Sequence, residues 1–419
     1  MAAFKQATPT WKPLSKSAQW MLVSVFATNI SNGIQNLAVA KLLYDATGST
    51  VDFGLTLILE NVLTFLLQLL AGPVVDRGQP NRVMIFADIS RGVVVCLSSL
   101  LLTQGHVFVW VAISIITINA AKPFYRAATF ALGPLVAEGD HLLIFNSVRG
   151  SSVQGGQMIG VAIAGPLIYW LGTAPAFAAN GVSYLLAAGA IAFARVPLLA
   201  VPENQRSSWW STLWGDWNNV FRYLRRERGL FWHMFLVSGD FLVVAFLNIA
   251  LVPIVAVDLH NQSYWLSVLD GSFAVGSLIT SALAPTLIQK WGYRRSVLSA
   301  LSVESVLFFG LSVFHEVYFL TAFMIAFGAA NTVSLTVFMN TLQRRTERKL
   351  RGRIASIRSF LLSILSLMFI PVVTRAQNVS LTYGLRISGS VVLVFLAAVL
   401  ALGSRFMFAE KLLGLNDGQ

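Results

Sequence analysis

Long apolar stretches alternate with short polar segments along almost the whole chain. Each stretch holds roughly 20 mainly apolar residues, the length that an α-helix needs to cross the hydrocarbon core of a bilayer. In lipid every backbone polar group must be paired internally, and a helix does this within one segment. The pattern predicts twelve membrane-spanning helices, near residues 18–43, 51–75, 82–104, 107–130, 145–171, 174–197, 229–257, 264–289, 295–313, 317–342, 353–375 and 380–405.

The predicted spans fall into two related groups of six. Residues 70–83 (LAGPVVDRGQPNRV) align with residues 283–296 (LAPTLIQKWGYRRS), and Ser147-Val148-Arg149 aligns with Ser356-Ile357-Arg358. Parallel repeats of this kind place a binding site between the halves, near the midplane. The sequence therefore predicts an all-α integral membrane fold of two pseudosymmetric six-helix bundles, with an N-terminal bundle at 1–197, a linker at 198–228 and a C-terminal bundle at 229–419.

The linker contains an amphipathic pattern. Large apolar residues recur at helical spacing and are followed by an arginine-rich stretch; they are Trp210, Leu213, Trp214, Trp217, Phe221 and Leu224. A helix with one aromatic face and a basic end is typical of segments that lie in the membrane interface. We expect an interfacial helix on the cytoplasmic side, serving as a structural linker, with a regulatory latch as the alternative.

Composition and charge agree with a membrane protein. Hydrophobic residues make up 56% of the chain and charged residues only 11%, whereas a soluble domain carries about 25% charged residues. The net charge of +12 comes from Lys and Arg in the links on one side of the predicted spans. The positive-inside rule explains this asymmetry without a nucleic-acid partner and places both termini in the cytoplasm of a multi-pass inner-membrane protein. The link at 131–144 is an acidic exception, and Lys122 and Arg126 before it are expected near the cytoplasmic end of span four.

The sequence lacks the motifs of several kinds of catalytic and nucleotide-binding site. The chain has no Gly-x-x-x-x-Gly-Lys-Ser/Thr pattern for ATP, no His-Glu-x-x-His and no Gly-x-Ser-x-Gly. The single cysteine, Cys96, has no metal-ligand spacing. We therefore expect no enzyme, no cofactor and no metal site. An alternative function of another class is a receptor or scaffold that does not transport. Such a protein would not move any solute across vesicle membranes, whereas a transporter would.

Three embedded carboxyl groups are candidates for proton coupling. A charge at the bilayer centre costs about 2.5–3.5 kcal/mol on insertion scales, so such groups are functional candidates. Asp240 lies about midway along span seven without an obvious local cation, and a desolvated carboxyl group binds a proton more readily. Glu60 belongs to a polar stripe on span two, and Asp270 belongs to its counterpart on span eight.

Other charges inside the predicted spans have simpler explanations. Asp88 and Arg91 are three residues apart on span three, so they can pair on the surface of one helix. Glu304 on span nine has no local partner. We interpret all three as structural residues.

Amides and arginines mark a predicted cavity. Asn29, Asn32 and Asn36 share one face of span one, and Arg149 and Arg358 are related by the repeat. The two arginines suit an anionic cargo, or they snorkel to the cytoplasmic surface. The full set of cavity candidates is Asn29, Asn32, Asn36, Asn61, Asn119, Arg149, Asn331 and Arg358.

At this point the chain resembles the major facilitator superfamily. Gly72-Pro-Val-Val-Asp76-Arg77-Gly-Gln-Pro-Asn-Arg82 is similar to the superfamily's cytoplasmic loop signature, except at Gln79, where a second glycine is usual. Gly72 permits close helix contact, and Asp76 can pair with a helix N-terminus or with Arg353. The resemblance implies a cytoplasmic gate made of Gly72, Asp76, Arg77, Arg82 and Arg353.

Further segments resemble one branch of that superfamily, the enterobactin exporter and the macrolide efflux proteins. They include Asp88-Ile-Ser-Arg91, Leu132-Gly-Pro134, Phe177-Ala-Ala-Asn180 and Leu350-Arg351-Gly352-Arg353, and Gly156-Gln-Met-Ile-Gly160 with Gly165-Pro166 is similar to the antiporter motif. The resemblance implies a monomeric secondary active exporter of a small organic molecule, a siderophore or a drug-like compound, with protons as the coupling ion and lipid as its surroundings. A lipid or lysolipid flippase of the same fold is the alternative.

Overall fold

The computed structural model describes residues 14–47, 51–102, 107–196, 209–236, 238–259 and 264–406. These residues form helices and no strands. The first half contains α1 (Lys16–Thr47), α2 (Val51–Arg77), α3 (Pro80–Leu101), α4 (Val107–Val136), α5 (Asp140–Leu171) and α6 (Thr173–Phe193). The second half contains α8 (Arg228–Leu236), α9 (Ser238–Val257), α10 (Tyr264–Trp291), α11 (Tyr293–Leu311), α12 (Val317–Arg345), α13 (Arg351–Val379) and α14 (Leu381–Phe406).

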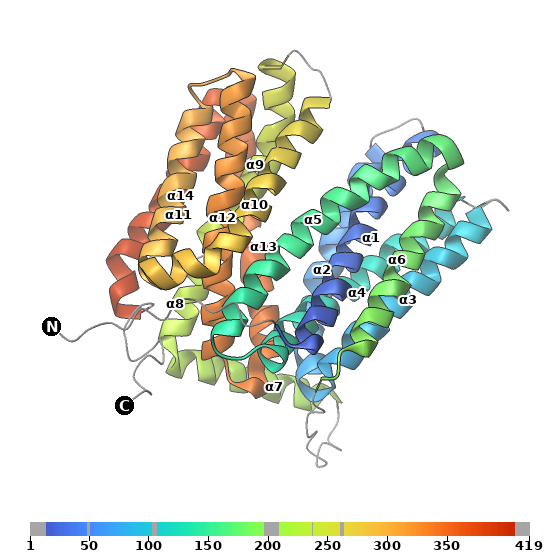
Figure 1. Ribbon diagram of the computed structural model, residues 1–419, viewed down its shortest axis with the longest axis horizontal. Helices are drawn as coiled ribbons and strands as arrows, with labels where there is room; N and C mark the ends of the chain where they lie inside the picture. Colours follow the sequence, from blue (N-terminus) through green and yellow to red (C-terminus); the bar gives the residue numbers. More distant parts are fainter. Residues whose placement is uncertain are drawn as a thin grey trace.

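The helices form two bundles side by side (Figure 1). Helices α1–α6 pack on one another, and α8–α14 form the second bundle, in which α8 and α9 together occupy the seventh predicted span. The bundles touch through α2, α4 and α5 on one side and α10, α12 and α13 on the other. They lie close together at the end that carries α7 (Trp209–Arg226) and diverge at the other. We call these the closed end and the open end.

The twelve-helix fold predicted from the apolar pattern is confirmed, with longer helices than expected at several ends. Among the described residues, seven helical stretches are long and apolar enough to cross a membrane by themselves. The acidic link predicted at 131–144 is mostly helical, because α4 continues to Val136 and α5 already begins at Asp140. Gly139 between them has φ 58°, a left-handed conformation that suits glycine. Asp140 and His141 therefore belong to the start of α5, and Glu138 lies in the short turn between the helices.

Glycines of the antiporter-like motif pack α5 against α1. A Cβ atom at Gly156 would lie 2.6 Å from the carbonyl oxygen of Phe26, and one at Gly160 would overlap the carbonyl oxygen of Ile30. Small residues allow such close backbone approach, which is how helices associate in lipid. These two positions are therefore explained by helix packing.

Helix α7 crosses beneath the closed end (Figure 1). It buries Val220 and Leu224, whereas Phe221, which the sequence analysis placed in the same apolar set as Leu224, is exposed. The hydroxyl group of Tyr223 donates a hydrogen bond of 2.9 Å to the carbonyl oxygen of Arg345, at the end of α12. The side chains of Trp210, Leu213 and Trp214 lie outside the described residues.

Candidate functional site

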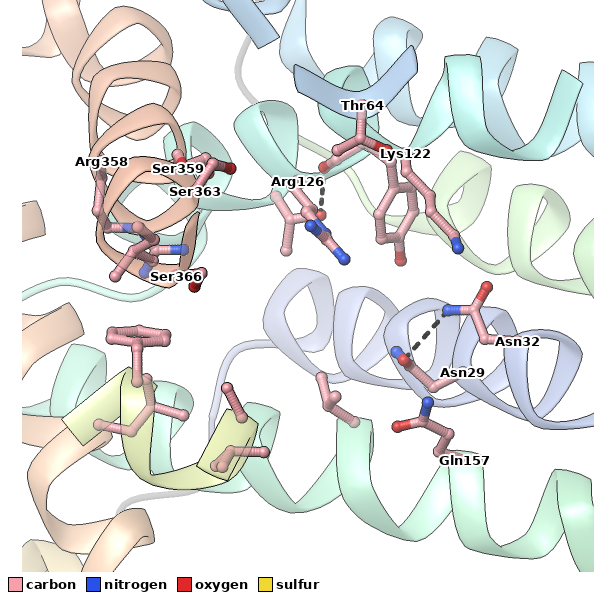
Figure 2. A pocket seen from close by; sticks show the side chains of 18 of the residues that line it. Asn29, Asn32, Thr64, Lys122, Arg126, Gln157, Arg358, Ser359, Ser363 and Ser366 are labelled. Carbon is pink, nitrogen blue, oxygen red and sulfur yellow. Dashed lines mark hydrogen bonds between the residues drawn. The ribbon is translucent and has the colours of Figure 1, made fainter. Parts of the chain in front are cut away.

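A large cavity lies between the two bundles, above the closed end. Its volume is about 1440 Å³, and residues from both halves line it. Figure 2 shows the polar part of the wall, with Asn29, Asn32 and Gln157 on one side and Arg358, Ser359 and Ser363 across from them. This volume exceeds the roughly 300–1,000 Å³ of most small-molecule sites. The cavity can therefore hold a sizeable organic molecule.

The closed end is held by a carboxylate on a helix N-terminus. Asp76, at the end of α2, accepts hydrogen bonds of 2.6 Å and 3.0 Å from the backbone N–H groups of Gly352 and Arg353. The Nε atom of Arg353 lies 3.5 Å from the same carboxylate, and both side chains are buried. A carboxylate at this position is stabilised by the orphan N–H groups and by the helix dipole.

Only part of the predicted gate meets at this contact. Gly72 packs directly on α13, since a Cβ atom there would lie 2.6 Å from the Cα atom of Arg353. Thus the structure brings Gly72, Asp76 and Arg353 together. Arg77 is half-buried at the end of α2, and Arg82 is exposed on α3.

A second set of contacts between the bundles was missed by the sequence analysis. The amide of Asn146 donates to Gln343 at 2.6 Å, and Gln343 donates to the carbonyl oxygen of Phe130 at 3.0 Å. Ser147 donates to the carbonyl oxygen of Ser281 at 2.5 Å. These amide and hydroxyl groups extend the closed end toward the cavity. Their residues are distant in sequence, so spacing along the chain could not indicate these contacts; Asn146-Ser147 belongs to a segment that resembles the exporter branch, which is the one signal that marked it.

Asparagines on α1 line the N-terminal wall, as predicted. Asn32 donates to the side-chain oxygen of Asn29 at 3.3 Å and accepts from the hydroxyl group of Tyr184 at 2.8 Å. Asn119 on α4 is buried at the same cavity. The side chains of Asn36, Glu60 and Asn61 lie outside the described residues.

Basic residues from three helices form part of the cavity wall. Lys122, Arg126, Arg149 and Arg358 all line the cavity. Lys122 and Arg126 were expected near the cytoplasmic end of span four, but they lie in the middle of α4 because this helix is longer than its apolar stretch suggests. The guanidinium group of Arg358 lies 5.0 Å from the ring centroid of Phe241.

Two carboxyl groups meet inside the C-terminal bundle. Asp240 on α9 is fully buried at the cavity wall and accepts a hydrogen bond of 3.1 Å from Asn331 on α12. Glu304 on α11 is also fully buried, and its carboxyl group interacts with that of Asp240. Ser334 lies near Asp240 and Asn331 near Glu304, but Asp240 Oδ2 and both oxygens of Glu304 have no hydrogen bond of normal geometry among the described residues. The sequence analysis interpreted Glu304 as a structural residue, because a partner on another helix cannot be predicted from spacing along the chain.

Asp270 lies apart from this pair. It is exposed on α10 and lines a smaller cavity of about 250 Å³, which adjoins the large one at Gln154 and Asn248. The structure therefore does not bring Asp240 and Asp270 to one site.

The predicted pair on α3 is present and buried. Asp88 and Arg91 are 2.5 Å apart, with side chains 0% and 1% exposed, and Thr28 donates to Asp88. The Arg91 guanidinium group also lies 4.8 Å and 4.7 Å from the ring centroids of Tyr125 and Tyr184. Every group of the pair is thus held by protein contacts, which favours the structural interpretation.

Removal of the Asp88 charge is expected to destabilise the N-terminal bundle. Asp88→Ala leaves a buried guanidinium group without its carboxylate, a change that costs about 3–5 kcal/mol in proteins. Thermal unfolding of the detergent-purified protein should show a large decrease in midpoint. Glu316→Gln, at an exposed carboxyl group before α12, should leave the midpoint unchanged. Equal midpoints for the two variants would contradict a structural role for Asp88.

Comparison with known proteins identifies the family. The family model described as Major Facilitator Superfamily matches residues 21–370. No curated protein sequence matches the chain. The fold resembles a bacterial homologue of the iron transporter ferroportin in an outward-facing state, with TM-score 0.74 and 16% identity over 93% of this chain and 100% of that one.

Two further crystal structures have the same fold. A bacterial ferroportin homologue with soaked iron has TM-score 0.73 and 16% identity over 93% of this chain and 99% of that one. The human organic anion transporter MFSD10 (TETRAN) has TM-score 0.66 and 15% identity over 92% of this chain and 99% of that one. At such low identity these likenesses establish the fold alone. Because the family model covers most of the sequence, this chain belongs to the Major Facilitator Superfamily and is a multi-pass membrane transporter of the alternating-access type, not an enzyme.

Proposed function

We propose that this protein exports a small organic molecule from the cytoplasm in exchange for protons. The observation that carries the proposal is a large cavity, closed at one end, with the buried Asp240–Glu304 pair at its wall. The closed end is the cytoplasmic one, so this conformation is open to the outside. The cargo binds in the cavity while the bundles are closed outside and leaves when they take the arrangement seen here.

The distribution of basic residues supports this orientation. Arg222, Arg225 and Arg226 are exposed on α7, and Arg294 and Arg295 are exposed at the start of α11, all at the closed end. Clusters of Lys and Arg in short loops favour the cytoplasmic side. The domain division at 1–197, 198–228 and 229–419 and the cytoplasmic termini belong to the same proposal.

The carboxyl pair supports proton coupling. Two adjacent carboxylates cannot both be ionised in a buried site without a large electrostatic cost. Neither Asp240 nor Glu304 has an ion-pair partner among the described residues. A proton shared between them would supply the donor that their oxygens lack, and the pair would then titrate as one unit. Asp240 connects this unit to the cavity.

Proton entry then supplies the driving force. A membrane potential of 100 mV contributes about 2.3 kcal/mol for each charge that moves across. In the open conformation a proton from outside reaches Asp240 along the cavity and neutralises the pair. Return of the bundles to the inward-open arrangement carries it to the cytoplasm, where its release allows the next cargo molecule to be exported.

The wall of the cavity favours a polar organic cargo, such as a siderophore or an amphipathic drug-like compound. Amides and basic side chains face the cavity from both bundles. The lining also contains apolar surface, so a flippase for lipids or lysolipids stays the alternative. One of the similar structures is an organic anion transporter, which agrees with an organic cargo.

Vesicle transport tests the proposal. The purified full-length protein is reconstituted in liposomes with a catecholate siderophore, an aromatic carboxylate and a cationic dye, and each compound is measured by mass spectrometry. An imposed proton gradient should drive movement of at least one compound against its concentration gradient. If all rates equal those of protein-free liposomes with and without the gradient, the proposed function is wrong.

A further inference from the structure

Three arginines from different helices surround one region of the cavity. Arg126 comes from α4, Arg149 from α5 and Arg358 from α13, so the two bundles both contribute. Arg126 and Arg149 are near enough to Arg358 for their charges to repel it. Figure 2 shows Arg126 and Arg358 on opposite sides of the same space.

Two of these arginines, Arg149 and Arg358, have no counter-charge among the residues that the structure describes. Arg149 and Arg358 take part in none of the ion pairs between described residues, and the Nε atom of each lacks a hydrogen-bond partner. The neighbours of the Arg358 guanidinium group are uncharged: Nη1 lies 3.0 Å from the sulfur of Met339, and the group faces the ring of Phe241. A desolvated cation without a counter-charge is costly. The site is therefore built to receive negative charge.

Among the described lining residues the acidic one is Asp240, and it does not supply this charge. Asp240 is directed into the C-terminal bundle, where it contacts Asn331 and Glu304. Snorkelling to the cytoplasm does not explain the arginines either. Arg149 lies one turn beyond Asn146 and Arg358 more than a turn beyond Arg353, both on the cavity side of the contacts that seal the closed end.

The surroundings of the arginines combine hydroxyl groups with apolar surface. Ser359, Ser363 and Ser366 follow Arg358 along the cavity face of α13 (Figure 2). Phe65 and Phe241 add aromatic surface to the same wall. Hydroxyl donors beside guanidinium groups suit oxygen-rich anions, and the rings suit an aromatic or aliphatic body.

We infer that the cargo is an amphipathic organic anion whose acidic oxygens bind between Arg149 and Arg358. This inference rests on the proposed function and specifies its substrate class. Arg149 belongs to the N-terminal bundle and Arg358 to the C-terminal bundle, so one bound anion joins the two halves. It replaces a repulsion between like charges with two charge-assisted contacts. Bound cargo thereby favours the arrangement in which these helices lie close together.

The test compares probes of opposite charge on one aromatic core. The full-length protein in lipid nanodiscs is titrated at pH 7.5 with 5-carboxyfluorescein, a polyanion, and with rhodamine 6G, a cation, and fluorescence anisotropy is corrected with empty nanodiscs. The anionic probe should bind saturably, and rhodamine 6G should not displace it. Arg149→Gln combined with Arg358→Gln should weaken its binding by about tenfold or more, because each lost hydrogen bond to a charged group has a large effect.

Two further variants separate charge from folding. Arg375→Gln changes an exposed arginine on the same helix α13 and should bind the anionic probe like the original protein. Arg149→Lys combined with Arg358→Lys keeps both charges and should restore part of the affinity for the anionic probe. Size-exclusion chromatography checks that all variants stay monodisperse. The inference is overturned if carboxyfluorescein does not bind saturably, if the double Gln variant binds it unchanged, or if rhodamine 6G competes equally.

The transport assay distinguishes the two proposals. If a proton gradient drives rhodamine 6G but carboxyfluorescein does not bind, the inference about the anion fails and the exporter proposal stands. If the anion binds with the expected arginine dependence but no proton gradient affects its movement, the coupling proposal fails and the anion site stands.

Discussion

Proton-driven export is expected to stop when Asp240 is replaced with asparagine. The amide keeps the size of the side chain and its contact with Asn331 but cannot carry a proton. The variant therefore loses the group through which a proton in the cavity reaches Glu304. Cargo exchange down a concentration gradient does not need this proton, so it should continue. Glu304→Gln should also reduce coupling, although Asp240 keeps its place at the cavity wall.

Proteoliposomes separate these two activities. Uphill cargo movement under a proton gradient is measured beside exchange of labelled against unlabelled cargo without a gradient. Asp240→Asn should lower the first to the level of protein-free liposomes and preserve the second. Asp258→Asn, just beyond α9 and paired with His315, is the control and should retain both. Full gradient-driven transport in Asp240→Asn would refute the assignment of the proton site.

Loss of the Asp76 carboxylate is expected to open the closed end. Asp76→Ala removes two hydrogen bonds to the start of α13 and the charge that the helix dipole stabilises. Hydrogen bonds to charged groups each contribute about 1.5–3 kcal/mol. Loss of about 3 kcal/mol shifts a two-state equilibrium by about a hundredfold. The inward-open arrangement should then be populated and the export rate should fall sharply.

Chemical labelling measures this opening. Ser147 is buried at the contact between the bundles, so a cysteine there, in a protein whose Cys96 is replaced by serine, should react slowly with a membrane-impermeant maleimide. Adding Asp76→Ala should accelerate the reaction. Asp140→Asn is the matched control, because the Asp140 side chain is 82% exposed and lies 3.5 Å from Arg344, and such exposed pairs contribute little. Unchanged labelling in Asp76→Ala would show that this contact does not hold the closed end.

The apolar pattern was sufficient to predict the twelve helices, and the loop motif was sufficient to find the main contact between the bundles. Gly72, Asp76 and Arg353 meet as expected, because two short segments, 72–82 and 350–353, resemble the family and mark the two partners. Helix ends were less predictable. Charged residues such as Lys122 and Arg126 interrupt the apolar signal of α4, although the helix continues past them to Val136.

Contacts between helices could not be predicted from one sequence. Asp240 and Glu304 are isolated in the sequence, and nothing in the spacing of either helix indicates that their carboxyl groups face each other. The same holds for Asn146 and Gln343, which meet only because the two bundles come together. The rotation of each helix about its axis decides such contacts, and an apolar stretch that is surrounded by lipid and protein carries a weak signal for that rotation.

Pairs of spin labels measure alternating access most directly. One pair replaces exposed Leu171 and Val379 at the open end, and another replaces exposed Glu138 and Lys349 at the closed end. Distances are recorded in nanodiscs for the original protein and for Asp76→Ala, with Cys96 replaced by serine in both. We expect Asp76→Ala to shorten the distance at the open end and lengthen it at the closed end. The fraction of molecules that shows the first change should equal the fraction that shows the second. If the two distances change in the same direction, or if neither changes in a variant that still transports, the two bundles do not move as this account requires.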